Sequence, residues 1–500
     1  MKDLLVGLDV GTSSVKTAVF TTRGQLLACA AAPIKLYLPQ PGWAEQDPDE
    51  WWQAVCTTLK QITGKIDAGR ISCIGLSGQC PGHVLVGRDH QAIGKAIIWQ
   101  DQRAVEEAVW LSKYIPAEKA REWIGTDTLG DATCPPARLL WLKKNRPEEW
   151  ERAEAVIQPK DFIALRLTDA IATDQYSAYC LGNTRNRIYA EDFFTLLDIE
   201  IQKMPDMIAP TQIVGRVTER AEREAGIIQG TPVVIGTIDA YCDNLAGGIS
   251  APGRAVDVAG TSEIISLSIG KEVSTEGVYP VNLGEGVRFL CGPTQAGGDT
   301  LRWLSHCFFP ESGSAIEYEK IESEAGAAPA ASDGLIFLPY LNGERAPVWD
   351  AEAKGGFIGL TYQHERRHYC RAVYESIGYA IRHILESCEE AAGDKAEELV
   401  VCGGGSRSVF WNQVKADILQ RPVKPTAITE TGCLGAAILA SVGCGIYMDH
   451  REASEKMIIF KDSVKPDIRH AKKYEAGYRA YRRGYQAIKL IFPDSREEKV

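Results

Sequence analysis

The sequence predicts an α/β protein with two domains of similar size, and three observations lead to this fold class. The chain has 500 residues, whereas a single hydrophobic core stops growing at roughly 250–300 residues. Short apolar stretches that end in glycine-rich turns alternate with longer stretches of helical spacing, which is typical of α/β proteins. The segment Asp-Val-Gly-Thr-Ser at Asp9 recurs at Asp257 with one inserted alanine, which indicates an approximate internal duplication.

The first copy of the repeat is predicted to be a strand, a tight polar turn and a second strand. Val6, Leu8 and Val10 alternate, residues 11–14 read Gly-Thr-Ser-Ser, and residues 15–20 resume an extended apolar run. In the second copy, residues 255–258 and 264–269 have the same pattern. Further strands are expected at 70–76, 231–238 and 398–402, and helices at 48–61, 103–112, 366–391 and 408–419.

A domain boundary is expected near residues 244–254, where three glycines and Pro252 cluster. We therefore divide the chain into residues 1–245 and 246–500. The uncharged run from Thr431 to Met448 approaches the length of a membrane span, but it contains four glycines. We expect it to form a close-packed helix in a soluble core.

Composition excludes several classes of protein. Hydrophobic residues make up 45% and charged residues 24%, as in ordinary globular proteins, and the formal net charge is −11. Acidic residues are spread along the chain, which argues against nucleic acid or an anionic membrane as the main partner. The 14 cysteines form no C-x-x-C pair, which favours buried thiols in a reducing compartment, and we expect a cytoplasmic protein without a secretion signal.

The two Gly-Thr-Ser turns are candidate phosphate sites. Their backbone amides and hydroxyls can surround phosphate oxygens, and the preceding Asp9 can hold a Mg²⁺ ion that binds the phosphate. A single such turn is more simply explained as a hairpin, but two copies, each preceded by an aspartate, favour a phosphate clamp. Neither a P-loop nor a G-x-G-x-x-G fingerprint is present.

Two glycine-rich segments leave alternatives open. Residues 403–405, Gly-Gly-Gly, follow a strand and precede a helix, which suits either close approach of a nucleotide or a permissive helix start. Gly432 and Gly435 suit a second close approach, and tight helix packing explains them equally well.

A set of motifs, taken in order, resembles the FGGY family of carbohydrate kinases, most closely its xylulokinase-like branch. The resemblance extends from about residue 4 to residue 445. It rests on residues 9–14, 77–79, 97–103, 257–262, 343–347 and 403–406. It implies two actin-like (ribonuclease H-like) domains flanking a catalytic cleft, ATP as co-substrate with Mg²⁺, and phosphoryl transfer to a hydroxyl of a sugar or polyol.

The resemblance also implies a catalytic base after a Pro-Val-Val strand, which places it at Asp239. Phosphoryl transfer needs such a carboxylate on the attacking hydroxyl. Asp243 is a rival, because an Asp-Asn pair is common at the base in xylulokinases. Counting from Pro232 to the strand end favours Asp239, since Asp243 would lie one turn into the next helix. An ordinary helix-capping role is the simpler alternative for either residue.

On the sugar side, the expected contacts are Gln79, Trp99, Asp101 and Arg103, together with Asp239. Trp99 is alternatively a core residue, and Arg103 alternatively pairs with Asp101. The usual xylulokinase segment Ser-Gly-Gln-Met-His-Gly reads Ser-Gly-Gln-Cys-Pro-Gly here at residues 77–82. The missing histidine makes the sugar itself undetermined, and we do not transfer its role to His83.

On the nucleotide side, we expect phosphate contacts from the two turns and adenosine contacts from the glycine-rich segment. The predicted residues are Thr12, Ser13, Gly260, Thr261, Ser262, Gly404, Gly405 and Asn412. Thr300, in the segment Gly298-Asp299-Thr300, is a further candidate, although this segment equally suits a helix start.

Two classes of function are compatible with these residues. The first is an ATP-dependent kinase for a ketopentose such as xylulose, or for a related sugar or polyol, and a homodimer is the expected assembly. The second is a nucleotide-switched binding ATPase of the actin or chaperone architecture without a small-molecule acceptor. Residues 99–103 and Asp239 favour the kinase.

Overall fold

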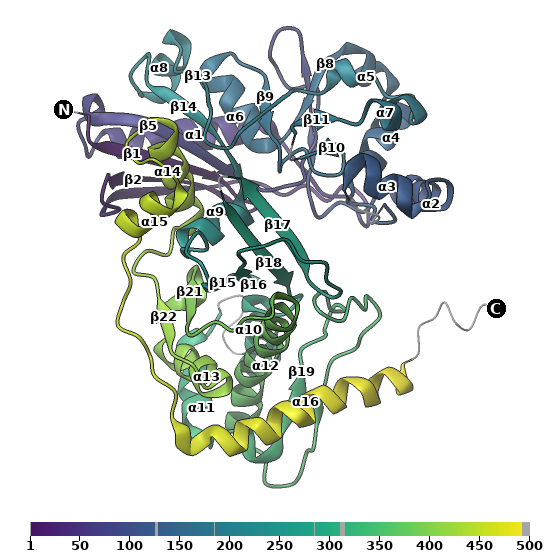
Figure 1. Ribbon diagram of the computed structural model, residues 1–500, viewed down its shortest axis with the longest axis vertical. Coiled ribbons are helices and arrows are strands. Elements are labelled where there is room, and N and C mark those ends of the chain that lie inside the picture. The colour runs from purple at the N-terminus through teal and green to yellow at the C-terminus, as the bar shows by residue number, and fades with distance from the viewer. Residues whose placement is uncertain (1, 126–128, 185, 285, 311–315, 493–500) are drawn as a thin grey trace. The chain divides into compact units, whose positions relative to one another are not determined.

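The protein is seen here as a computed structural model that describes residues 2–125, 129–184, 186–284, 286–310 and 316–492. The chain divides into two compact units, Met1–Ala246 with Glu430–Met457 and Gly247–Thr429 with Ile458–Val500 (Figure 1). The first border lies one residue beyond the expected boundary. Residues 430–457, which the sequence-based division placed in the second domain, belong to the first unit.

Unit 1 is built on a six-stranded mixed sheet in the order β3-β2-β1-β5-β14-β13. β1, β2 and β3 are successively antiparallel, and β5 and β14 run parallel to β1. The strands of this sheet are β1 (Leu4–Val10), β2 (Ser14–Thr21), β3 (Leu26–Pro33), β5 (Ile71–Gly78), β13 (Ile213–Arg216) and β14 (Pro232–Ile238). The strands predicted at the repeat, at 70–76 and at 231–238 are confirmed.

Helices and short two-stranded sheets complete unit 1. The helices are α1 (Pro48–Thr63), α2 (Val105–Tyr114), α3 (Ala117–Ile124), α4 (Pro135–Asn145), α5 (Pro147–Arg152), α6 (Pro159–Thr168), α7 (Glu191–Leu196), α8 (Glu219–Ala225), α9 (Asp239–Ala246), α14 (Thr431–Gly443) and α15 (His450–Met457). The short strands are β4 (Glu45–Gln46), β6 (Val84–Gly87), β7 (Ala96–Ile97), β8 (Ala153–Ile157), β9 (Ala172–Asp174), β10 (Gly182–Asn183), β11 (Ile188–Tyr189) and β12 (Asp206–Ile208).

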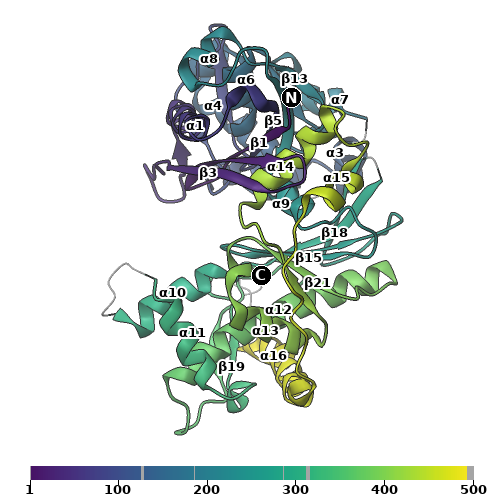
Figure 2. The same cartoon turned by 90° about the vertical axis from the view of Figure 1, so that its left-hand side faces the viewer.

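Helix α14 packs directly on β1 and β5, which explains why it belongs to unit 1 (Figures 1 and 2). A Cβ atom on Gly7 would lie 1.8 Å from the carbonyl oxygen of Cys433, and one on Gly75 would lie 1.9 Å from that of Ala436. Only glycine permits this distance between a strand and a helix backbone. The uncharged run is therefore a close-packed core helix, as predicted. Among the described residues, no helix combines the length and apolar character needed to cross a membrane.

Unit 2 is built on a second six-stranded mixed sheet in the order β17-β18-β16-β15-β21-β22. Its strands are β15 (Ala255–Ala259), β16 (Glu263–Ser268), β17 (Tyr279–Gly284), β18 (Val287–Pro293), β21 (Leu399–Cys402) and β22 (Val423–Pro425), and a separate pair is β19 (Ile336–Leu338) with β20 (Gly356–Ile358). Its helices are α10 (Gly298–Phe308), α11 (Tyr318–Ala327), α12 (Arg366–Ala392), α13 (Val409–Leu419) and α16 (Ala471–Ile491).

The two sheets repeat one topology. In each, a strand that ends at a Gly-Thr-Ser turn pairs antiparallel with the next strand and parallel with a later one, β1 with β2 and β5 in unit 1, and β15 with β16 and β21 in unit 2. Apolar side chains fill the space beneath each sheet and form separate cores. The internal duplication read from the sequence is therefore a duplication of the sheet and its turn.

Candidate active site

Asp9 lies at the end of β1, and the sheet register provides its partner. Asp9 stands opposite Ser77 of the parallel strand β5, and the Ser77 hydroxyl donates to Asp9 Oδ1 at 2.7 Å. Burial raises the pKa of Asp9, while the Ser77 hydrogen bond and the charge of Lys16 partly oppose that rise. Asp9 is half-buried, and among the described residues the hydrogen bond from Ser77 goes to Oδ1 and none goes to Oδ2.

The start of α14 fits against this carboxylate. A Cβ atom on Gly432 would lie 2.8 Å from Asp9 Cγ, and Thr431 Oγ1 donates to Asp243 Oδ1 at 2.6 Å. Gly435 packs against the backbone of Cys242 in α9. Of the two interpretations of Gly432 and Gly435, the structure supports helix packing, because both glycines contact protein atoms.

Asp239 directly follows β14 and is the first residue of α9, as the strand count predicted. Its Oδ1 accepts the amide of Ala240 at 2.7 Å. Burial raises the pKa of Asp239 well above its usual value, and the nearby charges of Asp9 and Asp243 raise it further. A carboxylate in this setting has an increased affinity for a proton.

Asp243 lies one turn into α9, and its environment differs from that of Asp239. Burial raises its pKa to about 7, with Thr431 opposing this rise and Asp9 adding to it. Its side chain is held by Thr431. The three carboxylates of Asp9, Asp239 and Asp243 thus form one electrostatically coupled group within unit 1.

Gln79 and Trp99 lie beside the first turn. Gln79 is almost fully buried, and its Nε2 donates to Gln46 Oε1 at 2.7 Å and to the Gly11 carbonyl at 3.3 Å. Its Oε1 has no hydrogen-bond partner among the described residues. Trp99 is 40% exposed and donates from Nε1 to Thr12 Oγ1 at 2.9 Å. Trp99 is therefore a surface residue at the turn and not a core residue.

For Arg103 the structure shows the alternative that the sequence left open, a pair with Asp101. Both side chains are completely buried and bond to each other at 2.8 Å, and Arg103 also pairs with Glu45 at 2.8 Å. The guanidinium lies 3.7 Å from the ring centroid of Trp43, and Asp101 Oδ2 accepts the amide of Ala44 at 2.6 Å. Arg103 binds Glu45 and Asp101 binds the Ala44 amide. The pair therefore supports residues 43–46 from the buried side.

Arg138 is a buried residue of this region that the sequence analysis missed. From α4 it donates to the carbonyls of Pro81 at 3.2 Å, Trp99 at 3.0 Å and Asp101 at 2.9 Å, and it has no exposed surface. It therefore holds the Cys80–Pro81 turn against the Trp99–Asp101 segment. An arginine within the apolar first two turns of α4 was the available sequence signal. His83 is buried, and burial together with Arg138 keeps its pKa well below the usual value.

The second turn lies at the surface of unit 2. Gly260 and Thr261 are exposed and Ser262 is half-buried. The Gly260 amide donates to the Ser262 carbonyl at 3.1 Å, and the amides at the start of α10 donate to the Gly260 and Thr261 carbonyls. Thr300, predicted as a nucleotide contact, is 4% exposed, and its hydroxyl accepts the Gly297 amide at 3.4 Å. Thr300 thus caps α10 from within.

Asp257, the second copy of Asp9, is completely buried in an ion triad. Lys415 Nζ lies 2.6 Å from Asp257 Oδ2 and 3.2 Å from Glu263 Oε2, and none of the three side chains is exposed. Asp257 and Glu263 belong to the two strands that flank the second turn. The triad therefore connects this turn to α13.

The glycine-rich segment has one open and one packed position. A Cβ atom on Gly404 would meet nothing within 4 Å, whereas one on Gly405 would lie 2.7 Å from Ala259 Cβ. Asn412 is buried and donates to the Ser406 carbonyl at 2.9 Å. The space beside the Gly404 backbone is therefore free of protein atoms, and the buried Asn412 holds the segment through its hydrogen bond to Ser406.

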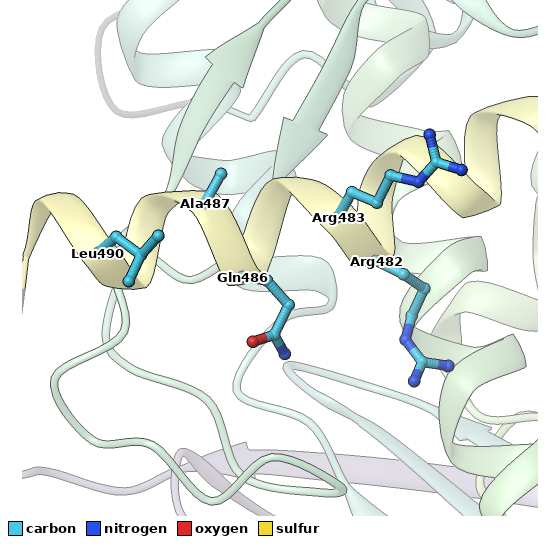
Figure 3. A pocket seen from close by; sticks show the side chains of 5 residues that line it. All are labelled: Arg482, Arg483, Gln486, Ala487 and Leu490. Carbon is cyan, nitrogen blue, oxygen red and sulfur yellow. The ribbon is translucent and has the colours of Figure 1, made fainter.

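A separate surface hollow of about 510 Å³ lies along α16 (Figure 3). Its lining consists of Arg482, Arg483, Gln486, Ala487 and Leu490. It contains no carboxylate and none of the predicted site residues, so we do not consider it the reaction site.

Comparison with known proteins identifies the family. Residues 4–246 match the N-terminal domain and residues 255–444 the C-terminal domain of the FGGY family of carbohydrate kinases. The chain belongs to this family. It is 30% identical to a xylulose kinase of Staphylococcus epidermidis over 99% of each chain, and 28% identical to a gluconokinase of Bacillus subtilis over 92% of this chain and 91% of the relative. A crystal structure of xylulose kinase from Rhodospirillum rubrum superimposes with a TM-score of 0.86 at 27% identity, covering 98% of this chain and 100% of that one.

These findings confirm the predicted family, the two-domain actin-like α/β fold and the class of enzyme. The chain is an ATP-dependent, xylulokinase-like carbohydrate kinase. The alternative of a nucleotide-switched binding ATPase is not favoured.

Proposed function

We propose that the enzyme transfers the γ-phosphoryl group of ATP to a hydroxyl of a ketopentose such as xylulose, or of a related sugar or polyol, with Asp239 as the base. The observation that carries this proposal is the position of Asp239 directly after β14, at the first residue of α9. Burial and the charges of Asp9 and Asp243 raise its pKa there, which suits a proton acceptor. Asp239 takes the proton of the attacking hydroxyl, the hydroxyl oxygen bonds to the γ-phosphorus, and the bond to the β-phosphate oxygen breaks to release ADP.

The residues around Asp9 suit a magnesium ion. Mg²⁺ prefers one or two carboxylates together with waters and phosphate oxygens. Asp9 keeps one oxygen available, Asp243 adds a second negative charge nearby, and Lys16 is the cation that lowers the pKa of both. When bound, Mg²⁺ would neutralise charge on the phosphates. Thr12 and Ser13 of the adjoining turn would bind phosphate oxygens.

The sugar pocket is proposed to lie between Gln79, Trp99 and Asp239. Gln79 Oε1 is a buried acceptor to which no described residue donates. This suits a sugar hydroxyl, because unpaired buried polar atoms are costly. Asp101 and Arg103 would act indirectly by holding residues 43–46.

We further propose that the enzyme works in the cytoplasm, in keeping with its 14 cysteines, and that it has no nucleic-acid partner, in keeping with its net charge of −11. A homodimer is the proposed assembly, because closed symmetric dimers are the commonest oligomers.

A coupled ADP-release assay tests the reaction. The panel comprises D-xylulose, L-xylulose, D-ribulose, L-ribulose, xylitol, ribitol, erythritol, arabinitol, glycerol and gluconate. We expect one acceptor to stimulate ADP release well above the basal rate, and Asp239→Asn to reduce that rate by about 10²–10⁴-fold while ATP binding persists. Asp243→Asn is the comparison variant, and it should reduce turnover less than Asp239→Asn does. If Asp239→Asn retained turnover and Asp243→Asn lost it, Asp243 would replace Asp239 as the base.

A further inference from the structure

Arg345 lies directly beside the second Gly-Thr-Ser turn. Its Nη2 donates to Ser262 Oγ at 3.2 Å, and its Nε donates to the Thr294 carbonyl at 3.2 Å. Thr294 follows β18, which neighbours β16 in the sheet. The guanidinium is thereby fixed against the turn by strand-end atoms of its own unit.

The guanidinium of Arg345 forms no salt bridge within the described part of the chain. No Asp or Glu among the described residues lies within 4.0 Å of it, whereas Arg302 on α10 pairs with Asp299 at 3.2 Å. The neighbouring Glu344 faces the backbone, since its Oε1 accepts the amides of Gln295 at 2.6 Å and Arg345 at 2.8 Å. Arg345 is half-buried, and burial lowers its pKa from the usual value. The charges of Tyr279 and Glu344 oppose this fall only in part, and a partly desolvated guanidinium that makes no salt bridge attracts an anion.

The hydrogen bond to Ser262 determines how that hydroxyl can act. Its oxygen accepts from Arg345, so its own proton remains available for donation to an outside acceptor. Arg345 Nη1 donates to no protein atom in the described part of the chain, and this nitrogen is not buried from solvent. The Ser262 hydroxyl and Arg345 Nη1 therefore provide two donors and one positive charge beside the exposed residues Gly260 and Thr261.

We propose that Arg345 binds a phosphoryl oxygen of the nucleotide polyphosphate together with the Ser262 hydroxyl. This inference rests on the proposed function and adds a residue to its nucleotide site. A guanidinium offers parallel N–H donors that match phosphate geometry, which an ammonium group lacks. Arg345 thus provides within unit 2 the positive charge that the Gly-Thr-Ser turn itself lacks.

Binding of ADP and of adenosine to the full-length enzyme tests the proposal. Isothermal titration would compare wild type with Arg345→Gln, Arg345→Lys, Ser262→Ala and the double variant Ser262→Ala/Arg345→Gln. We expect Arg345→Gln to weaken ADP binding by about 10–100-fold and adenosine binding less than about twofold. Arg345→Lys should fall between wild type and Arg345→Gln. The double variant should lose less than the product of the two single effects, because the two groups bind the same oxygen.

The control is Arg302→Gln, which removes an exposed and paired charge from the same unit and should leave both affinities unchanged. Equal loss of ADP and adenosine binding, or unchanged ADP binding in Arg345→Gln, would overturn the role of Arg345. If Arg345→Gln failed to fold, Arg345→Lys and Ser262→Ala would decide by the same criterion. Selective loss of ADP binding with no turnover of any acceptor would instead overturn the proposed function and leave the phosphate contact standing.

Discussion

Asp9 and Asp257 occupy equivalent places in two sheets of the same topology, each on the strand that leads into a Gly-Thr-Ser turn. Asp9 is half-buried, receives one hydroxyl from Ser77 and shares its surroundings with two more carboxylates. Asp257 is completely buried and bonds to Lys415. Asp257 thus has a cation bonded to it, whereas Asp9 has only the more distant charge of Lys16 and is our proposed magnesium ligand. The strand and turn are alike in the two units. The helix that packs against the aspartate differs, since α14 presents Gly432 to Asp9 and α13 presents Lys415 to Asp257.

The largest expected effect is on the buried ion triad of Asp257, Glu263 and Lys415. Lys415→Met leaves two carboxylates buried without a partner, and we expect a loss of about 3–5 kcal/mol in the free energy of unfolding. Urea unfolding followed by circular dichroism measures this. The triple variant Asp257→Asn/Glu263→Gln/Lys415→Met should recover most of the stability. A single-variant loss below about 1 kcal/mol would contradict the assigned role of the triad.

In unit 1, a substitution of Asp9 should reduce turnover and leave stability intact. We expect Asp9→Asn to reduce turnover by about 100-fold or more, since removing one preorganised electrostatic contact typically has this effect. Its unfolding free energy should stay equal or rise, because repulsion with Asp239 and Asp243 is relieved. ADP release across a Mg²⁺ titration measures the first effect and urea unfolding the second. An unchanged Mg²⁺ response would count against Asp9 as the metal ligand.

A substitution in the helix that faces Asp9 tests how the contact is built. In Gly432→Ala the new methyl group would lie 2.8 Å from Asp9 Cγ, so we expect a stability loss of about 1–3 kcal/mol together with reduced turnover. Gly404→Ala is the matched control, because its methyl group meets nothing within 4 Å and stability should change by less than about 0.5 kcal/mol. Thermal unfolding of both variants decides.

The smallest expected effect is a shift in pH dependence. With Asp239 as the proposed base, turnover needs its ionised form, so the rate should rise with pH through its raised pKa. Asp243→Asn should move this rise to lower pH, because one repelling charge is gone. Stability should show the opposite trend. The folded state holds protons on these carboxylates that the unfolded chain has already released, so stability falls as pH rises from the unfolded pKa toward about 7 for Asp243. A pH-rate profile that is identical in Asp243→Asn and wild type would refute the coupling.

Much of the fold was predictable from local sequence patterns. The alternation at Val6, Leu8 and Val10, the duplicated turn and the glycine positions follow from backbone sterics and side-chain period, which act over a few residues. The same patterns placed Asp239 at the end of its strand. They also identified the run after Thr431 as a close-packed helix.

The tertiary structure alone decided what each polar side chain touches. No feature of the sequence near Asp257 indicates that its partner is Lys415, which lies 158 residues further along the chain. Asp101 and Arg103 resemble surface ligands in sequence, yet they are buried together against Trp43. Arg345 gains its contact with Ser262 across 83 residues. Local sequence determines a backbone conformation, but the net charge of a site is the sum over side chains that only folding brings together.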